Sequence, residues 1–281
     1  MNDVETTWRA RDGAELFVRS WLPEATPRAA IALVHGLGEH SGRYQHVAAH
    51  FNQAGYIVQS FDLRGHGKTP GPRGHVRSIE LILQDIDLLL EKIAQAYPSL
   101  PCFLYGHSLG GNLVLFYALS YKRDLSGVIA TSPGLITALQ DQKIKIFFAR
   151  ILGVLMPGVI LSTGLDANLI SRDPQIVQDY IADPLVHDRS SLGFAKGMLD
   201  MNNWVMAHAQ EFEYPLLLTH GANDQIAYPR GSQEFAALVP ENVTLKLWDG
   251  LAHELHNEPE KEQVLQYILG WMDQQLVLQS K

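Results

Sequence analysis

Short apolar segments alternate with segments of helical periodicity along most of this chain, and this alternation limits the folds that it can adopt. The apolar segments are AAIALVH (29–35), YIVQSFD (56–62), PCFLYGH (101–107), GVIATSP (127–133), YPLLLTH (214–220) and VTLKLW (243–248). An unbroken apolar run indicates a strand that is buried on both faces. Strands of this kind separated by helices predict a mostly parallel sheet with helices on both sides, which is an α/β fold.

The interval between about Leu135 and His208 interrupts this alternation, because it contains helix-like segments and no clear strand. Ligands of parallel α/β sheets bind at the carboxyl edge of the strands. We therefore predict a core formed by residues 1–134 and 209–281, with a helical cap at 135–208 inserted over the carboxyl edge.

The composition is that of a globular protein with a large core, since 46% of the 281 residues are hydrophobic and 19% are charged. The net charge of −8 argues against a general affinity for nucleic acids. The single cysteine, Cys102, excludes an intrachain disulfide and fits a reducing compartment. Because the segment MNDVETTWRARDG lacks the apolar stretch of a signal peptide, we expect a cytoplasmic location, with peripheral membrane attachment as the alternative.

The segment YGHSLGGN (105–112) carries the most specific signal of chemistry. It fits the pattern G-x-S-x-G, in which a serine lies at a sharp turn between a strand and a helix. We expect Ser108 in a strained backbone conformation, and Gly106 and Gly110 lack the β-carbons that would collide across the turn. A serine with a purely structural role is the alternative. The position between a buried strand and an amphipathic helix favours a nucleophile.

A serine hydroxyl needs a base, and the base needs an acid that orients it. In the chain order typical of this turn, the serine is followed by an acid and then a histidine, each just past a later strand. Asp224 and His253 occupy these positions, so we predict a triad of Ser108, His253 and Asp224. Asp249 stays open as an alternative acid.

Other histidines compete with His253, and we expect structural positions for them. We place His256 at the start of the final helix, His220 in the core at a strand end, and His107 beside the serine turn. The run His253-Glu-Leu-His256 lacks the H-E-x-x-H spacing of a zinc site, and no third ligand is evident. The sequence therefore predicts no metal and no cofactor.

The glycine-rich turn HGLGEHSGRY (35–44) admits two functions. Its glycines are similar to those of a dinucleotide-binding loop, but Ser41 occupies the position of the third glycine. A serine hydrolase needs two backbone N–H groups for the oxyanion, one from the residue after the nucleophile and one from a loop such as this. We therefore predict Leu37 and Leu109 as the oxyanion donors.

Charged residues near this turn are expected to be structural. Glu39 and Arg43 have the spacing of an ion pair at a helix start. Asp62 and Arg64 in FDLRGHG are expected to fix the loop behind the site.

Five segments together resemble the monoglyceride lipase and lysophospholipase branch of the α/β-hydrolases. They are HGLGEHSGRY, FDLRGHGKTPGPRGH, GHSLGGN, GANDQIAYP and DGLAHELHNE. The resemblance runs through nearly the whole core. It implies the α/β-hydrolase fold, a triad of Ser108, Asp224 and His253, and Leu37 and Leu109 as oxyanion donors, with no metal and no cofactor. The implied activity is hydrolysis of a small single-chain lipid ester, with monoacylglycerol before a lysophospholipid or a short-chain ester.

Three rival functions share these motifs. A peptidase of the same fold and an acyltransferase would use the same triad. A hydrolase-like receptor or scaffold would have lost its chemistry, and the intact Ser108, Asp224 and His253 argue against it.

The predicted cap contains the longest apolar stretch, IKIFFARILGVLMPGVIL (144–161), which is interrupted by charges and marginal in length for a membrane span. Its apolar residues are expected either to line an acyl-chain site or to pack the cap onto the core; they are Phe147, Phe148, Ile151, Leu152, Leu155 and Met156. Basic residues lie beside them, namely Lys143, Lys145 and Arg150. Transient contact of the cap with a membrane surface is therefore a further hypothesis.

Overall fold

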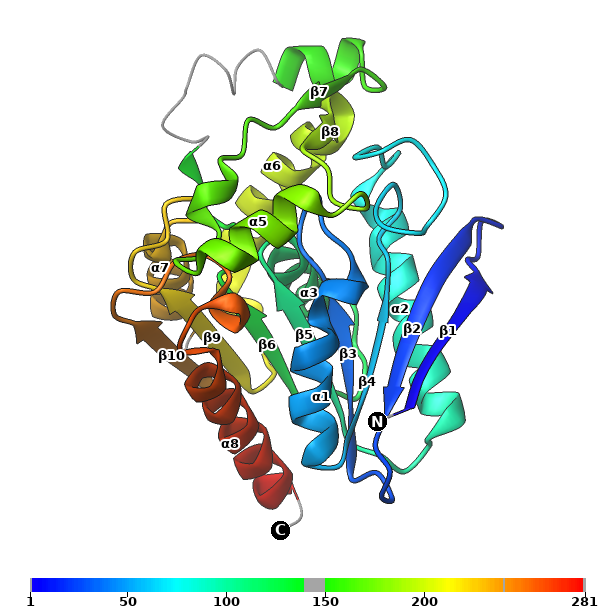
Figure 1. The fold of residues 1–281 in the computed structure, drawn as a ribbon, viewed down its shortest axis with the longest axis vertical. Coiled ribbons are helices and arrows are strands. Elements are labelled where there is room, and N and C mark those ends of the chain that lie inside the picture. The colour runs from blue at the N-terminus through cyan, green and yellow to red at the C-terminus, as the bar shows by residue number, and fades with distance from the viewer. Residues whose placement is uncertain (1, 139–149, 240, 280–281) are drawn as a thin grey trace.

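The computed structural model describes residues 2–138, 150–239 and 241–279. Its main sheet has eight strands in the order β1-β2-β4-β3-β5-β6-β9-β10 (Figure 1). The strands are β1 (Asn2–Arg9), β2 (Glu15–Leu22), β3 (Ala29–Val34), β4 (Tyr56–Phe61), β5 (Cys102–His107), β6 (Gly127–Thr131), β9 (Leu216–Gly221) and β10 (Val243–Trp248). The β1–β2 and β2–β4 pairs are antiparallel, and all pairs from β4 to β10 are parallel. The predicted mostly parallel sheet is confirmed.

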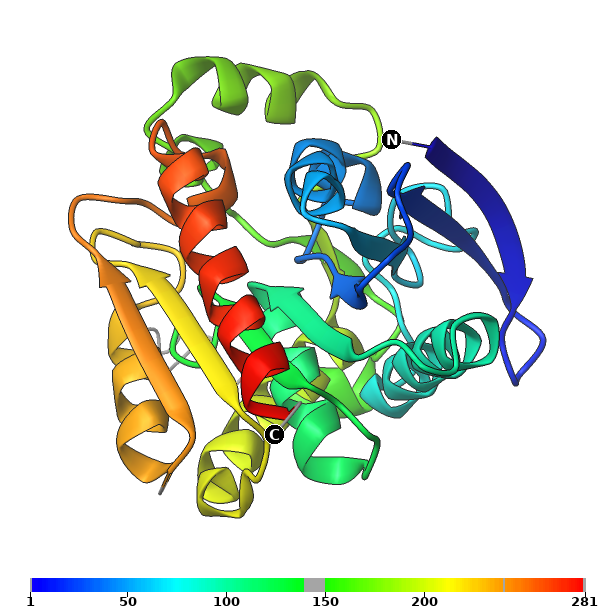
Figure 2. The same cartoon turned by 90° about the horizontal axis from the view of Figure 1, so that it is seen from below.

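Helices cover both faces of this sheet (Figure 2). The helices of the core are α1 (Gln45–Gln53), α2 (Ile79–Ala96), α3 (Leu109–Ser120), α7 (Pro229–Leu238) and α8 (Lys261–Gln279). Phe103 of β5 packs in one apolar cluster with α1 and α8, whereas the next residue, Leu104, packs in a second cluster with α2, α3 and α7. Successive strand residues point to opposite faces, so burial of both faces explains the unbroken apolar runs. None of the described helices is both long enough and apolar enough to cross a membrane.

Of the predicted insertion, the structure describes residues 135–138 and 150–208, and the segment 150–208 is called the cap below. It contains the helical residues 150–155, β7 (Ile160–Ser162), α5 (Pro174–Ala182), β8 (Arg189–Ser191) and α6 (Leu192–Ala207). Figure 1 shows these elements gathered at one end of the main sheet. Because β7 and β8 form an antiparallel pair, the expectation of no strand in this interval is wrong. Each strand has only three residues, which is too short for a periodic pattern. The domain boundaries near 135 and 208 stay a prediction.

The cap is bound to the core at two glycines that follow core strands. The backbone N–H of His187 donates to the carbonyl of Gly38 at 2.8 Å, and that of Ser191 donates to the carbonyl of Gly74 at 2.8 Å. Both glycines have a positive φ, 78° at Gly38 and 69° at Gly74. A β-carbon at Gly74 would lie 2.0 Å from the carbonyl oxygen of Arg189. The cap backbone therefore occupies the space that the side chain of any residue other than glycine would need at position 74.

Substitution of Gly74 by alanine should therefore destabilise the protein more than Gly13→Ala. Gly13 has a similar φ, 86° against 69°, so each substitution incurs the cost of a left-handed alanine, about 1–2 kcal/mol. A β-carbon at Gly13 would meet no atom within 4 Å, whereas Gly74→Ala must also displace the cap. We expect urea unfolding to show a further loss of about 2 kcal/mol for Gly74→Ala. Equal losses for the two variants would contradict this role of the contact.

Candidate active site

Ser108 occupies a strained turn between β5 and α3. Its φ of 53° and ψ of −117° are unusual for a residue with a side chain. A β-carbon at Gly106 would lie 2.1 Å from the carbonyl oxygen of Gly110, and one at Gly110 would lie 2.1 Å from that of Val34. The turn can therefore close only with glycine at both positions. This is the sharp strand-to-helix turn that the sequence predicts.

The three residues of the predicted triad meet in one hydrogen-bonded chain. The Nε2 atom of His253 lies 2.9 Å from the Oγ of Ser108, and its Nδ1 atom lies 2.6 Å from the Oδ2 of Asp224. Asp224 follows β9 and His253 follows β10, which are neighbouring parallel strands. Asp249, the alternative acid, is exposed, and no contact between it and His253 is recorded in the described part of the chain. The structure thus brings Asp224 to the histidine.

Asp224 is held from both of its oxygens. Its Oδ1 accepts hydrogen bonds from the backbone N–H groups of Ile226 and Ala227 at 2.8 and 3.0 Å. Its Oδ2 lies 3.1 Å from the Nε2 of His220, which is also 2.8 Å from the carbonyl oxygen of Ala227. Because the Asp224 carboxylate and the Ala227 carbonyl oxygen are both acceptors, the Nε2 atom of His220 carries the proton and donates to them. His220 is the core residue that the sequence predicts, and it also orients the acid, which the sequence did not indicate.

The charges of Asp224 and His253 shift each other's pKa. Burial raises the pKa of Asp224, but the imidazole of His253, together with the hydrogen bonds from His220 and His253, outweighs burial and holds this pKa well below its usual range. Burial lowers the pKa of His253, but the Asp224 carboxylate outweighs it and raises this pKa above its ordinary value. His253 is therefore a base strengthened by its acid.

The loop after β3 runs directly beside Ser108. A β-carbon at Gly36 would lie 3.3 Å from the β-carbon of Ser108. In the described part of the chain, no hydrogen bond is recorded from the N–H of Leu37 or from that of Leu109. Both groups are thus available to a bound oxyanion, as the prediction for these two residues requires.

The alternative use of this loop, as a cradle for a pyrophosphate, fits poorly. The N–H of Gly36 already donates to the Oε1 of Glu39 at 2.7 Å, and a carboxylate at this place would repel a phosphate. Asp62, the candidate ribose ligand, accepts from the N–H and the hydroxyl of Ser41 and from the N–H of Lys68 at 2.6–2.8 Å. Asp62 therefore fixes the loop, as expected for it.

The predicted ion pair between Glu39 and Arg43 is present, with an N–O distance of 2.8 Å. Arg43 also makes two hydrogen bonds of 2.7 Å to Glu254, the neighbour of His253. The arginine thus connects the loop after β3 to the loop that carries the histidine. Arg43 and Glu254 are 211 positions apart, and no local pattern indicated their contact.

The ring of His107 lies close to the rings of His253 and His256. The ring of His107 is 4.9 Å from that of His253 and 4.8 Å from that of His256, measured between centroids. This confirms the expected position of His107 beside the serine turn. The placement of His256 at the start of the last helix is wrong, because His256 belongs to a short 3-10 turn (Leu255–Asn257) and α8 begins at Lys261.

The apolar residues proposed for the cap are only partly described. Phe147, Phe148, Lys143 and Lys145 lie outside the described residues. Ile151, Leu155 and Met156 are 41%, 71% and 50% exposed, respectively. Packing of the cap onto the core therefore does not account for these three side chains.

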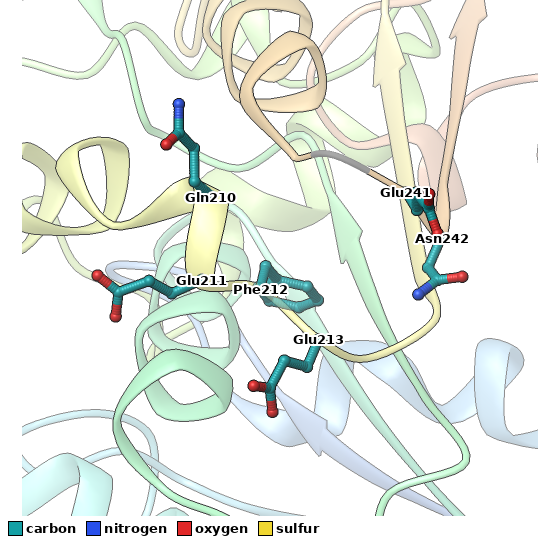
Figure 3. Close-up of a pocket in the computed structure, with 6 residues that line it drawn as sticks. All are labelled: Gln210, Glu211, Phe212, Glu213, Glu241 and Asn242. Atoms are coloured by element: carbon teal, nitrogen blue, oxygen red, sulfur yellow. The ribbon is translucent and has the colours of Figure 1, made fainter.

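A separate cavity of about 450 Å³ lies away from this site (Figure 3). It is lined by Gln210, Glu211, Phe212, Glu213, Glu241 and Asn242. These residues directly precede β9 and β10, whereas Asp224 and His253 follow the same two strands. The cavity therefore lies at the opposite edge of the sheet from Asp224 and His253.

Comparisons with known proteins agree with this geometry. Residues 25–260 match the family described as "Serine aminopeptidase, S33". The monoacylglycerol lipase of Mycolicibacterium smegmatis is 35% identical over 92% of this chain and 93% of its own length. The chain belongs to the monoglyceride lipase branch of the α/β-hydrolase superfamily.

Two further proteins are similar to this chain. The crystal structure of the Paleococcus ferrophilus monoacylglycerol lipase has a TM-score of 0.86 and 36% identity, and covers 92% of this chain and 99% of its own. An uncharacterized abhydrolase domain-containing protein of Dictyostelium discoideum is 43% identical over 94% of this chain. The chain spans 28% of the length of that protein. As a member of the monoglyceride lipase branch, the protein is an enzyme of the serine hydrolase type.

The raised pKa of His253 predicts how the activity depends on pH. The imidazole must be unprotonated to take the proton of Ser108, so kcat/KM should rise with pH and become constant above the pKa of His253. We expect the midpoint of this rise above pH 6.5, the ordinary value for histidine. The measurement is kcat/KM for a water-soluble ester from about pH 5 to about pH 9. A midpoint at or below pH 6.5 would contradict the charge balance described above.

Proposed function

We propose that this protein hydrolyses single-chain lipid esters, with monoacylglycerol as the favoured substrate and glycerol and a fatty acid as products. The observation that carries the proposal is the chain of contacts from Ser108 through His253 to Asp224, 2.9 and 2.6 Å long. The substrate class is taken from two relatives of similar length that are named monoacylglycerol lipases.

The geometry supports an acyl-enzyme mechanism. The Oγ of Ser108 attacks the ester carbonyl while the Nε2 of His253 takes its proton. His253 then gives this proton to the leaving glycerol oxygen, and the acyl group stays on Ser108. A water molecule, deprotonated by His253, releases the fatty acid. Asp224 holds the Nδ1–H of His253 and stabilises the imidazolium formed in each step. No step needs a metal or a cofactor.

The N–H groups of Leu37 and Leu109 are proposed to bind the oxyanion of each tetrahedral intermediate. Leu109 is the first residue of α3, and the first N–H groups of a helix have no partner within it. Leu37 lies in the loop that passes Ser108. Donors that are already in place lower the barrier because they need no reorganisation when charge develops.

We further propose that the predicted insertion, residues 135–208, covers this site and that the exposed apolar side chains of the cap touch a lipid surface. Ile151, Leu155 and Met156 lie close together in the sequence, next to the exposed Arg150. Leu155→Asp should lower the fraction of the protein that sediments with phosphatidylcholine vesicles and leave the hydrolysis of a soluble ester unchanged. Unchanged sedimentation would count against this contact.

The substrate proposal is tested by the release of fatty acid from monoacylglycerol, triacylglycerol and lysophospholipid, with Ser108→Ala as the blank. We expect the highest kcat/KM for monoacylglycerol and no release above the blank in the variant. Release from short esters alone would keep the triad and exclude the lipid assignment. Cleavage of a proline arylamide in place of esters would favour the peptidase alternative that the family description names.

The assignment of the acid is tested by a matched pair of variants. Asp224→Asn and Asp249→Asn each remove one carboxylate, but only Asp224 touches His253. We expect Asp224→Asn to lower kcat by about 10⁴-fold, because the histidine loses its orientation and tautomer. Asp249→Asn should retain the activity of the unaltered protein. The reverse order of effects would transfer the role of the acid to Asp249.

A further inference from the structure

The side chain of His35 holds the peptide group that follows it in the chain. His35 is completely buried at the end of β3. Its Nδ1 lies 2.8 Å from the carbonyl oxygen of Gly36, and its Nε2 lies 2.9 Å from the backbone nitrogen of Leu63. A backbone N–H can only donate, so Nε2 is the acceptor and the ring proton is on Nδ1. His35 therefore donates a hydrogen bond to the carbonyl of Gly36.

The carbonyl of Gly36 and the N–H of Leu37 belong to the same peptide group. In a planar trans peptide these two bonds point in opposite directions. A donor that fixes the carbonyl oxygen therefore fixes the direction of the N–H as well. We propose that His35 is a positioning residue that aims the Leu37 N–H at the oxyanion. This inference rests on the proposed function, in which Leu37 is one of the two oxyanion donors.

The other side of Gly36 is held too. Its own N–H donates to the Oε1 of Glu39 at 2.7 Å, and the hydroxyl of Tyr44 donates to the same oxygen at 2.7 Å. Both peptide groups around Gly36 are thus fixed by side chains. A β-carbon at Gly36 would lie 2.7 Å from this Oε1 and 3.3 Å from the β-carbon of Ser108. The loop therefore packs directly against Ser108 and leaves no space for a side chain at position 36.

The environment of His35 keeps its ring neutral. Burial lowers the pKa of His35, and this outweighs the carboxylates of Asp62 and Glu39, which act in the opposite direction. The neutral form is the one in which Nε2 can accept from Leu63 while Nδ1 donates to Gly36. The same tautomer therefore satisfies both contacts.

The two contacts of His35 can be separated by substitution. In His35→Asn the amide nitrogen can take the place of Nδ1 and donate to Gly36, but the side chain is too short to reach Leu63. In His35→Gln the amide oxygen can take the place of Nε2 and accept from Leu63, but no donor remains at the δ position. A purely structural role through Leu63 predicts that Gln is the better replacement, whereas positioning of the oxyanion donor predicts that Asn is.

The experiment compares kcat, KM and melting temperature of the two variants, using monoacylglycerol and the full chain. We expect His35→Gln to lower kcat by about 100-fold with little change in KM, as for the loss of one oxyanion donor. It should weaken binding of a trifluoromethyl ketone, whose hemiketal oxygen occupies the oxyanion site, by a similar factor. His35→Asn should stay within about fivefold of the unaltered protein in both measurements.

Equal activity of the two variants would overturn the proposal. So would a result in which His35→Gln has both the higher activity and the higher melting temperature. The rate at which a fluorophosphonate labels Ser108 gives the same comparison without a lipid substrate. Failure of the monoacylglycerol assignment would leave labelling intact, with His35→Gln still slower than His35→Asn. Absence of labelling in the unaltered protein would overturn both proposals.

Discussion

The arrangement of the candidate active site depends on one hydrogen-bonded contact, between the hydroxyl of Ser108 and the imidazole of His253. These residues are 145 positions apart, and Asp224 must reach the same imidazole from 29 positions away. A parallel sheet solves this problem because its strands all end at one edge. Asp224 and His253 follow the adjacent strands β9 and β10, and Ser108 follows β5, separated from β9 by β6 alone.

The same contact explains why backbone strain is retained at Ser108. A residue held at a positive φ costs about 1–3 kcal/mol, and the surrounding core must maintain it. The N–H of Ser108 donates to Thr131 of β6 at 2.9 Å, and its carbonyl accepts from Asn112 of α3 at 3.1 Å. α3 is largely buried between the sheet and α6. The apolar core thus holds the serine where His253 can reach it.

The sequence predicted the features that depend on local pattern and on the order of strands. The buried strands, the turn at Ser108 and the positions of Asp224 and His253 follow from apolar runs, glycine spacing and the geometry of a sheet edge. It did not indicate the bond from Arg43 to Glu254, because no spacing rule relates residues 211 positions apart. The sequence also predicted that His220 lies in the core, but it did not indicate that His220 contacts Asp224.

The cap was the least predictable part. β7 and β8 have three residues each. Apolar residues such as Leu155 are exposed, although packing of the cap onto the core was one of the two expectations for them. Whether an apolar side chain of the cap is buried depends on which other segment packs against it. The sequence of the cap does not identify that segment. The core was easier to predict because its inner strands, from β2 to β9, each pair with a neighbour on both sides.

The central claim is that the Leu37 loop, the Ser108 turn, Asp224 and His253 form one catalytic centre. A crystal structure of the protein after reaction with a trifluoromethyl ketone bearing an acyl chain tests it most directly. The account predicts a bond from the ketone carbon to the Oγ of Ser108, with the oxyanion about 3 Å from the nitrogens of both Leu37 and Leu109. An adduct on another residue, or an oxyanion directed away from these two groups, would contradict it.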